Sequence, residues 1–239
     1  AADGSLVPGR RRFVNVRRRA WLRVQAPADQ RIAGRSFRAT GAVVPAARLE
    51  RVTIEGARDG GRFRPLAAAR VRGGRVDARF TPPAGGRWRF RLVAAPRPGL
   101  DAGAIATAPA MEVFGANPHG VPASAPHYLV QAISEMRLYY YERGRLVRVF
   151  PVVFGKPSTP TPLGAYRVYS KTAGPGAAFG PLVLWYHRGY GIHGTNQEHL
   201  LARSWRYYSA GCTRNYNANI LWLWPRVPIG TPVRNIVGG

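Results

Sequence analysis

The stretch Arg87-Trp88-Arg89-Phe90-Arg91-Leu92 alternates arginines with large apolar side chains. Successive side chains of a β-strand point to opposite faces, so this stretch predicts a strand with one face in a core and the other in solvent. Arg75–Phe80 repeats the pattern, as do shorter runs such as Val52-Thr53-Ile54. Glycine pairs and the run Pro82-Pro83-Ala84-Gly85-Gly86 separate these stretches at the spacing of turns. The pattern predicts a mostly β chain built from short strands.

The composition along the chain predicts four regions. Residues 1–19 contain two arginine triplets and predict a basic N-terminal segment. Residues 20–115 carry the alternating runs and predict an antiparallel β-sandwich, immunoglobulin-like in the loose architectural sense. Residues 116–126 have a proline at every fourth position, which is typical of a stiff, semi-extended linker. Residues 127–239 hold the only cysteine and four of the five histidines, and predict a second domain of mixed β structure with short helices.

The charge of the chain is strongly positive, with 36 basic and 11 acidic residues and a formal net charge of +25. Such a surface attracts polyanions. The arginines are spread over both halves of the chain, and no aromatic–basic recognition motif is present. We therefore expect no specific nucleic acid partner, and the charge suits anionic polymers of a cell envelope equally well. The abundance of Arg, Ala, Gly and Pro also fits the codon bias of a GC-rich genome.

Several classes of protein are disfavoured by the cysteine count and the hydropathy pattern. A single cysteine excludes an internal disulfide framework and a multi-cysteine zinc site. The longest charge-free stretch, Val113–Ser134, is interrupted by glycines and prolines, so no transmembrane helix is expected. The opening Ala1-Ala2-Asp3 suits a secreted protein trimmed at its cleavage site, or a shortened chain.

Residue types used in cysteine chemistry gather in two short motifs, Tyr190-Gly191-Ile192-His193-Gly194-Thr195 and Ser209-Ala210-Gly211-Cys212-Thr213-Arg214. A lone cysteine is usually an inert core residue. Cys212, however, has a glycine before it and a cation at Arg214, and a nearby cation and base lower the pKa of a thiol. With His193 as the base, the two motifs predict a nucleophilic cysteine site.

A metal site is not expected. His187, His193 and His199 are spaced six residues apart, which matches no helical face, and no acidic or cysteine residue completes a ligand set. No cofactor is expected either.

The second half of the chain resembles the catalytic domain of the L,D-transpeptidases, the YkuD family. The hallmark of that family is a His-Gly pair followed by Ser-x-Gly-Cys-x-Arg, which His193-Gly194 and Ser209–Arg214 match. Three further segments, Ser134–Gly144, Gly155–Gly164 and Pro228–Val233, resemble the opening hairpin, the Pro/Thr-rich loop and the closing strand of the family. The resemblance covers about residues 126–237. Ala210 departs from it, because many members have a second histidine there.

The resemblance implies a cysteine-dependent acyltransferase that joins peptidoglycan tetrapeptide stems by 3→3 cross-links, through a thioester and with release of D-Ala. Cys212 would be the nucleophile and His193 its base, with the Gly194 carbonyl orienting the imidazole. Backbone N–H groups at Gly211 and Cys212 would form the oxyanion hole. The remaining implied site residues are Ser209 and Arg214 in the catalytic centre, and Tyr190, Ile192, Thr195, Trp205 and Thr213 at the substrate.

The resemblance also implies partners and a location. Donor and acceptor stems would be the substrates, and carbapenem β-lactams would be covalent inhibitors. The protein would lie outside the cytoplasm, in the cell wall or periplasm, secreted or anchored through a segment outside this chain. Three alternatives stay open: an L,D-carboxypeptidase that uses water, a transpeptidase that anchors proteins to the wall, and a non-catalytic wall-binding protein.

Overall fold

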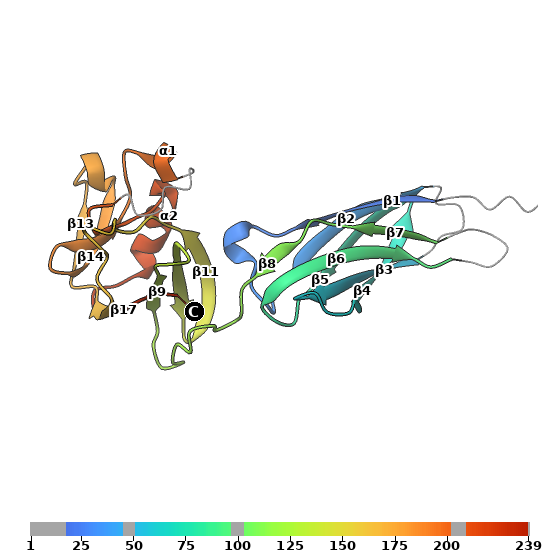
Figure 1. Cartoon of the computed structure of the whole chain (residues 1–239), viewed down its shortest axis with the longest axis horizontal. Helices are drawn as coiled ribbons and strands as arrows, with labels where there is room; N and C mark the ends of the chain where they lie inside the picture. Colours follow the sequence, from blue (N-terminus) through green and yellow to red (C-terminus); the bar gives the residue numbers. More distant parts are fainter. Residues whose placement is uncertain (1–17, 45–50, 97–102, 202–208, 239) are drawn as a thin grey trace, which may run out of the picture. The chain divides into compact units, whose positions relative to one another are not determined.

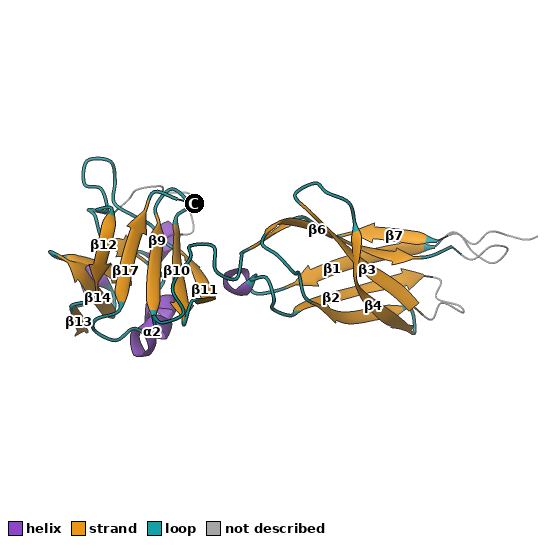
Figure 2. Ribbon diagram, turned by 90° about the horizontal axis from the view of Figure 1, so that it is seen from below, coloured by secondary structure: helices purple, strands orange, loops and turns teal. Residues whose placement is uncertain are grey.

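The computed structural model describes residues 18–44, 51–96, 103–201 and 209–238 (Figure 1). It is mostly β, as predicted from the alternating pattern, and Figure 2 shows few helices among the strands. The chain divides into two compact units. The N-terminal unit comprises Ala1–Ala26 and Ala33–Val113, and the C-terminal unit comprises Pro27–Ile32 and Phe114–Gly239.

The N-terminal unit is one curled antiparallel sheet with the strand order β1-β2-β5-β4-β3-β6-β7, and β8 pairs with β6. The curl brings β1 against β6 and β7, so that the sheet encloses a core. Its strands are β1 (Arg19–Gln25), β2 (Phe37–Val44), β3 (Arg51–Arg58), β4 (Arg64–Arg72), β5 (Arg75–Phe80), β6 (Gly86–Ala94), β7 (Ala104–Thr107) and β8 (Met111–Val113).

The alternation that predicted a strand places its apolar side chains as expected. Trp88, Phe90 and Leu92 of β6 are buried in the core of the N-terminal unit, and the Trp88 and Phe90 rings stack at 5.7 Å. The intervening arginines lie on the other face. All strands of the N-terminal unit belong to one hydrogen-bonded sheet. The immunoglobulin-like character of this unit therefore stays a prediction.

The C-terminal unit contains two sheets. The five-stranded sheet has the order β11-β10-β9-β17-β12, and the four-stranded sheet has the order β13-β14-β15-β16. Parallel pairs occur at β9–β17 and β15–β16. The strands are β9 (Tyr128–Ala132), β10 (Arg137–Glu142), β11 (Arg145–Pro151), β12 (Gly164–Arg167), β13 (Ser170–Ala173), β14 (Leu182–His187), β15 (Tyr190–His193), β16 (Thr213–Arg214) and β17 (Pro232–Ile236).

One hydrophobic core joins the two sheets of the C-terminal unit. Leu129 and Leu138 of the five-stranded sheet pack with Leu184 and Ile192 of the four-stranded sheet and with Ile220 of helix α2. The helical elements are α1 (Glu198–Leu201), α2 (Asn217–Leu223), and the 3-10 turns η1 (Ala28–Gln30), η2 (Ala177–Phe179) and η3 (Trp224–Arg226). This core and helix α2 therefore pack against the four-stranded sheet and fix its position.

The other face of the five-stranded sheet is covered by segments that the sequence assigned elsewhere. Ile32 pairs with Phe114 in a short parallel bridge, and the Arg148 guanidinium forms an ion pair with Asp29. The predicted linker also packs here: Val121 is buried, and its backbone N–H and carbonyl both bond the side chain of Asn117. Pro27–Ile32 therefore belongs to the C-terminal unit rather than to the predicted domain 20–115.

No helix within the described residues is long and apolar enough to cross a membrane.

Candidate active site

The register of two parallel strands decides which side chains of the predicted motifs meet. Ile192 of β15 lies opposite Thr213 of β16, and His193 lies opposite Arg214. Because side chains alternate along strands, His193, Arg214 and the preceding Cys212 share one face, while Ile192 and Thr213 share the other. The Gly191 N–H donates to Cys212 Sγ at 3.4 Å, which fixes the thiol beside β15.

His193 is the base that this face offers, and its tautomer is set by its neighbour. The Nδ1–H group donates to the Gly194 carbonyl, which leaves the lone pair on Nε2. Burial lowers the pKa of His193 to about 4, the Arg214 charge adds to the fall, and the backbone carbonyls of Gly194 and Phe179 oppose it. The ring packs edge-on against Phe179. His193 is therefore a neutral imidazole near pH 7, able to accept a proton.

The Cys212 thiol does not show the lowered pKa that the sequence suggested. Burial raises the pKa of Cys212 above its ordinary value, and the Gly191 N–H and the Arg214 charge only partly oppose that shift. The thiol itself donates to the Gly189 carbonyl at 3.7 Å. Desolvation outweighs the cation because the Cys212 side chain is half-buried against the turn between β14 and β15. Near pH 7 the resting site therefore holds a neutral thiol and a neutral imidazole.

The loop before Cys212 is held by hydrogen bonds to buried side chains. Ser209 Oγ accepts the Gly211 N–H at 3.1 Å, and Thr161 Oγ1 donates to the Gly211 carbonyl at 2.8 Å. Thr161 Oγ1 also accepts the Gly155 N–H at 2.9 Å, so one hydroxyl ties two loops together. Gly211 has a φ of +125°, and a Cβ there would strike the Tyr190 ring, so only glycine fits.

The segment at Gly194 is held in place by the side chain of Asn217. The Asn217 side chain accepts from the Thr195 N–H at 2.9 Å and donates to the Thr195 carbonyl at 3.0 Å. A Cβ on Gly194 would overlap Asn217 Oδ1 and come within 2.9 Å of Pro181 Cδ. Asn217 is the first residue of α2, but Tyr216 is the N-cap and no side chain caps this helix. Asn217 instead holds the segment that orients His193.

Three of the residues expected to contact substrate are buried. Ile192 lies in the core that joins the two sheets, and Thr213 donates from its hydroxyl to Gln131 on the face away from Cys212. Thr195 is buried as well, with its hydroxyl accepting the Gln197 N–H. All three side chains are closed to solvent in this structure, and their contact with substrate stays a prediction. Tyr190 is half-buried against Gly211, and Trp205 lies outside the described residues.

Arg214 lies at the edge of a hollow of about 650 Å³. Both its backbone N–H and carbonyl bond Val153, at 2.9 and 3.0 Å, and Nη1 donates to Gln197 Oε1 at 3.2 Å. Ala210 and Lys156 also line the hollow, which places it next to the loop that carries Cys212. The predicted motifs and the Pro/Thr-rich loop thus converge at one site. Thr161, Asn217 and Lys156 are the residues of this site that sequence reasoning missed.

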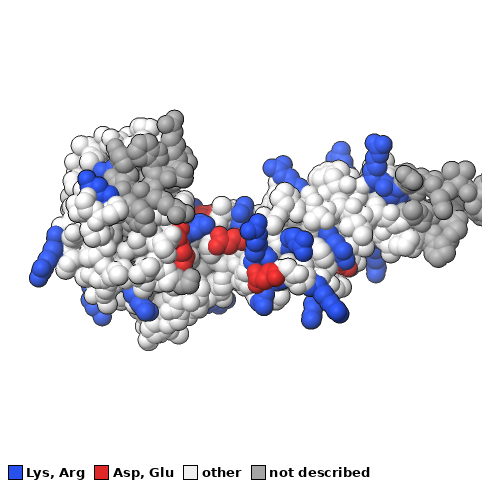
Figure 3. Space-filling view, in the orientation of Figure 1, with Lys and Arg blue, Asp and Glu red and all other residues white. Residues whose placement is uncertain are grey.

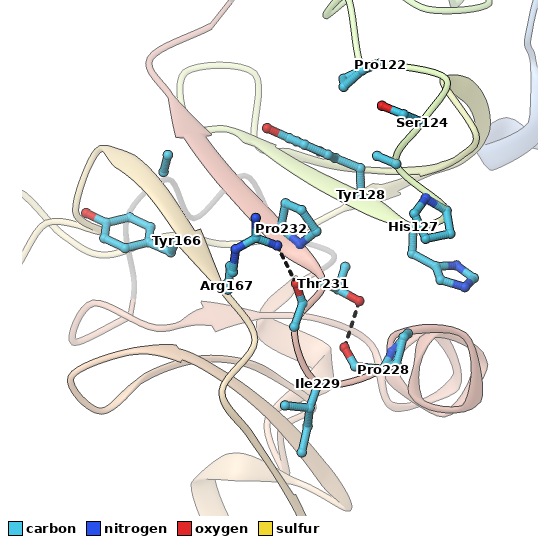
Figure 4. A pocket seen from close by; sticks show the side chains of 14 residues that line it. Pro122, Ser124, His127, Tyr128, Tyr166, Arg167, Pro228, Ile229, Thr231 and Pro232 are labelled. Atoms are coloured by element: carbon cyan, nitrogen blue, oxygen red, sulfur yellow. Dashed lines mark hydrogen bonds between the residues drawn. The ribbon is translucent and has the colours of Figure 1, made fainter.

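A larger hollow, of about 900 Å³, lies elsewhere on the C-terminal unit (Figure 4). Its walls come from the starts of β9 and β17, the end of β12 and the segment before β9, and include His127, Tyr128 and Arg167. Arg167 donates to the Gly230 carbonyl at 2.9 Å. None of the predicted site residues that the structure describes lines this hollow, so its size gives no reason to move the candidate site there.

On the face shown in Figure 3, Lys and Arg side chains are scattered over each unit and form no single stripe. Among the residues that the structure describes, no three His, Cys, Asp or Glu side chains come close enough to hold a metal ion.

Comparisons with known proteins agree on one family. A family model described as the YkuD L,D-transpeptidase catalytic domain matches residues 126–234. A putative L,D-transpeptidase YkuD from Bacillus licheniformis is 33% identical over 137 residues, covering 57% of this chain and 79% of that protein. The Bacillus subtilis protein of the same name is 31% identical over 113 residues, covering 47% of this chain and 67% of that protein.

Among solved structures, the L,D-transpeptidase (residues 123–326) from Xylanimonas cellulosilytica is similar at a TM-score of 0.43 and 23% identity. The match covers 50% of this chain and 63% of that chain.

Proposed function

Because this chain belongs to the YkuD family of L,D-transpeptidases, we propose that it is a cysteine-dependent enzyme that forms 3→3 cross-links between peptidoglycan stem peptides. The observation that carries the proposal is a shared strand face. His193, oriented through Nδ1 by the Gly194 carbonyl, lies on the same face as Cys212. A base whose lone pair lies on Nε2, on the same strand face as a thiol, is the arrangement that nucleophilic acyl transfer requires.

The first half-reaction forms a thioester. Nε2 of His193 takes the proton of the Cys212 thiol as Sγ attacks the carbonyl between the third residue of a tetrapeptide stem and its terminal D-Ala. The resulting oxyanion needs a backbone donor. The Gly211 N–H already bonds Ser209 Oγ, so the Cys212 N–H is the donor that we assign to this role. The tetrahedral intermediate collapses when the His193 imidazolium protonates the D-Ala nitrogen, and D-Ala leaves.

The second half-reaction resolves the thioester. The side-chain amine of the third residue of another stem attacks the thioester carbonyl, His193 accepts the amine proton, and the Cys212 thiol is regenerated. Water in place of the amine would give an L,D-carboxypeptidase, and a protein lysine would anchor that protein to the wall. The three products differ in mass, so the acceptor can be assigned directly.

The neutral resting pair supports general-base catalysis rather than a preformed thiolate. The pKa of His193 is lowered and that of Cys212 is raised, both mainly by burial. The proton therefore moves as the substrate is attacked. Ser209 and Thr161 act by holding the Gly211 loop, and Arg214 supplies positive charge at the edge of the site.

The substrate sets the location and the inhibitors that we expect. A peptidoglycan transpeptidase works outside the cytoplasm, in the periplasm or wall, where anionic envelope polymers would meet the +25 charge of this chain. A carbapenem presents a strained β-lactam carbonyl, which Cys212 can open to form a stable covalent adduct. We expect no cofactor and no specific nucleic acid partner.

The test uses the purified chain and a disaccharide-tetrapeptide, with products separated by mass. Wild type is expected to give cross-linked dimer with loss of D-Ala, and a Cys212→Ala variant is expected to give none. Intact mass after incubation with a carbapenem provides a second readout, because Cys212 is the only cysteine in the chain. Equal product from the variant would refute the cysteine mechanism. A Cys212→Ala variant with full biological effect would favour a non-catalytic wall-binding protein.

A further inference from the structure

The charged side chains described at the hollow beside the candidate site are both positive. Two cations, Lys156 and Arg214, line it with two amides, Asn196 and Gln197, and three alanines. None of the described residues that line it carries a carboxylate. The nearest acid along the chain, Glu198, accepts the backbone N–H of Asn217 at the start of α2. The hollow is therefore chemically suited to an anion.

The backbone at Lys156 is hydrogen-bonded to the loop that carries Cys212. Its N–H donates to the Ser209 carbonyl at 2.9 Å, and its own carbonyl accepts the Thr159 N–H at 2.9 Å. Thr161 ties the same loop to the Gly211 carbonyl. The side chain of Lys156 is exposed, so its ammonium is hydrated and available to a ligand while its Cα is fixed beside the cysteine loop.

Arg214 reaches the same hollow from the strand after the cysteine. It shares the strand face of His193 and Cys212, and its charge influences the pKa of both residues. Gln197 Oε1 accepts from Arg214 Nη1, so the Gln197 amide turns its own N–H donors away from the guanidinium. The hollow thus combines an ammonium, a guanidinium and amide donors next to the loop that carries Cys212.

We propose that Lys156 and Arg214 bind the free α-carboxylate of the residue that leaves the donor stem. The inference rests on the proposed function and names the group that the enzyme recognises on its donor. In a tetrapeptide donor this carboxylate is separated from the leaving nitrogen by a single carbon atom. A carboxylate site must therefore lie beside the nucleophile, and the lining residues Ala210 and Arg214 lie on either side of Cys212 in the chain.

Binding this carboxylate would restrict attack to the last peptide bond of the stem. Charge-assisted hydrogen bonds from Lys and Arg are stronger than neutral ones, and a carboxylate accepts several at once. Fixing it next to the scissile bond also orients the carbonyl toward Cys212 Sγ. A neutral carboxamide in the same place loses the charge attraction and brings N–H donors against the donors of the hollow.

The test compares two donors that differ only at this group. One is a tetrapeptide stem with a free terminal carboxylate, and the other is the same peptide with a terminal carboxamide. Release of D-Ala or D-alaninamide is measured for the full chain as wild type, Lys156→Gln and Lys156→Arg. We expect the wild type to favour the acid by about 10- to 100-fold in kcat/KM. Lys156→Gln should close most of this gap, chiefly through the KM of the acid, and Lys156→Arg should restore it.

Alkylation of Cys212 by iodoacetamide, which carries no carboxylate, shows whether each variant keeps its thiol site. A wild type that uses both donors equally would overturn the inference while leaving the transpeptidase intact. So would a Lys156→Gln variant that loses acid and amide turnover by the same factor. If the wild type consumes neither donor while its thiol is alkylated normally, the proposed function fails, and the inference fails with it.

Discussion

Thr161 offers a measurable test of how the cysteine loop is held. Its hydroxyl accepts the Gly155 N–H at 2.9 Å and donates to the Gly211 carbonyl at 2.8 Å, and all three residues are buried. In Thr161→Val the shape is kept, but both backbone groups lose their partner. Each unsatisfied buried group costs about 1–3 kcal/mol, so the free energy of unfolding should fall by about 3 kcal/mol. For a domain of this size that corresponds to a fall in Tm of about 6–12 °C.

The assay pairs thermal unfolding with the rate of carbapenem acylation at Cys212. Thr161→Ser is the matched control, because it keeps the hydroxyl and loses one methyl group, at a cost of about 0.8 kcal/mol. We expect Thr161→Val to acylate at least about tenfold more slowly, since a displaced Gly211 carbonyl moves the adjacent thiol. If Thr161→Val unfolds within about 0.5 kcal/mol of Thr161→Ser and acylates as fast, the two hydrogen bonds do not hold the loop, and the reasoning is wrong.

Three further predictions follow from the burial of the site. The pKa of Cys212 is raised, so its alkylation by iodoacetamide should keep increasing from pH 7 to beyond pH 9; a plateau near pH 7 would indicate a preformed thiolate. The pKa of His193 is lowered to about 4, so the folded state binds fewer protons than the unfolded state between that value and the ordinary pKa of about 6.5, and stability is lost as the pH falls through this window. Urea unfolding at pH 7, 5.5 and 4.5 should therefore show a smaller loss for His193→Gln than for wild type, and equal losses would contradict the burial argument. Gly194→Ala should displace Asn217 and lower carbapenem acylation by at least about tenfold, whereas near-wild-type acylation and Tm would show that the segment accommodates a Cβ.

The sequence predicted the local structure where one short pattern contains all the information. Trp88, Phe90 and Leu92 are buried as their alternation indicated, because successive side chains of any extended strand point to opposite faces. Pro27–Ile32 could not be assigned in this way. Its place in the C-terminal unit depends on partners far along the chain, such as the Asp29–Arg148 ion pair.

The candidate site also has features that local sequence predicts and features that depend on contacts far along the chain. The order and spacing of His193-Gly194 and Ser209–Arg214 predicted a thiol and a base from the sequence alone, because the type of a residue determines its functional group. The parallel register of β15 and β16, the hydroxyl of Thr161 and the amide of Asn217 came only from the tertiary structure. So did the direction of the Cys212 pKa. A motif records which groups are present, but burial and contacts across the chain decide how strongly a charge is desolvated and what each group touches.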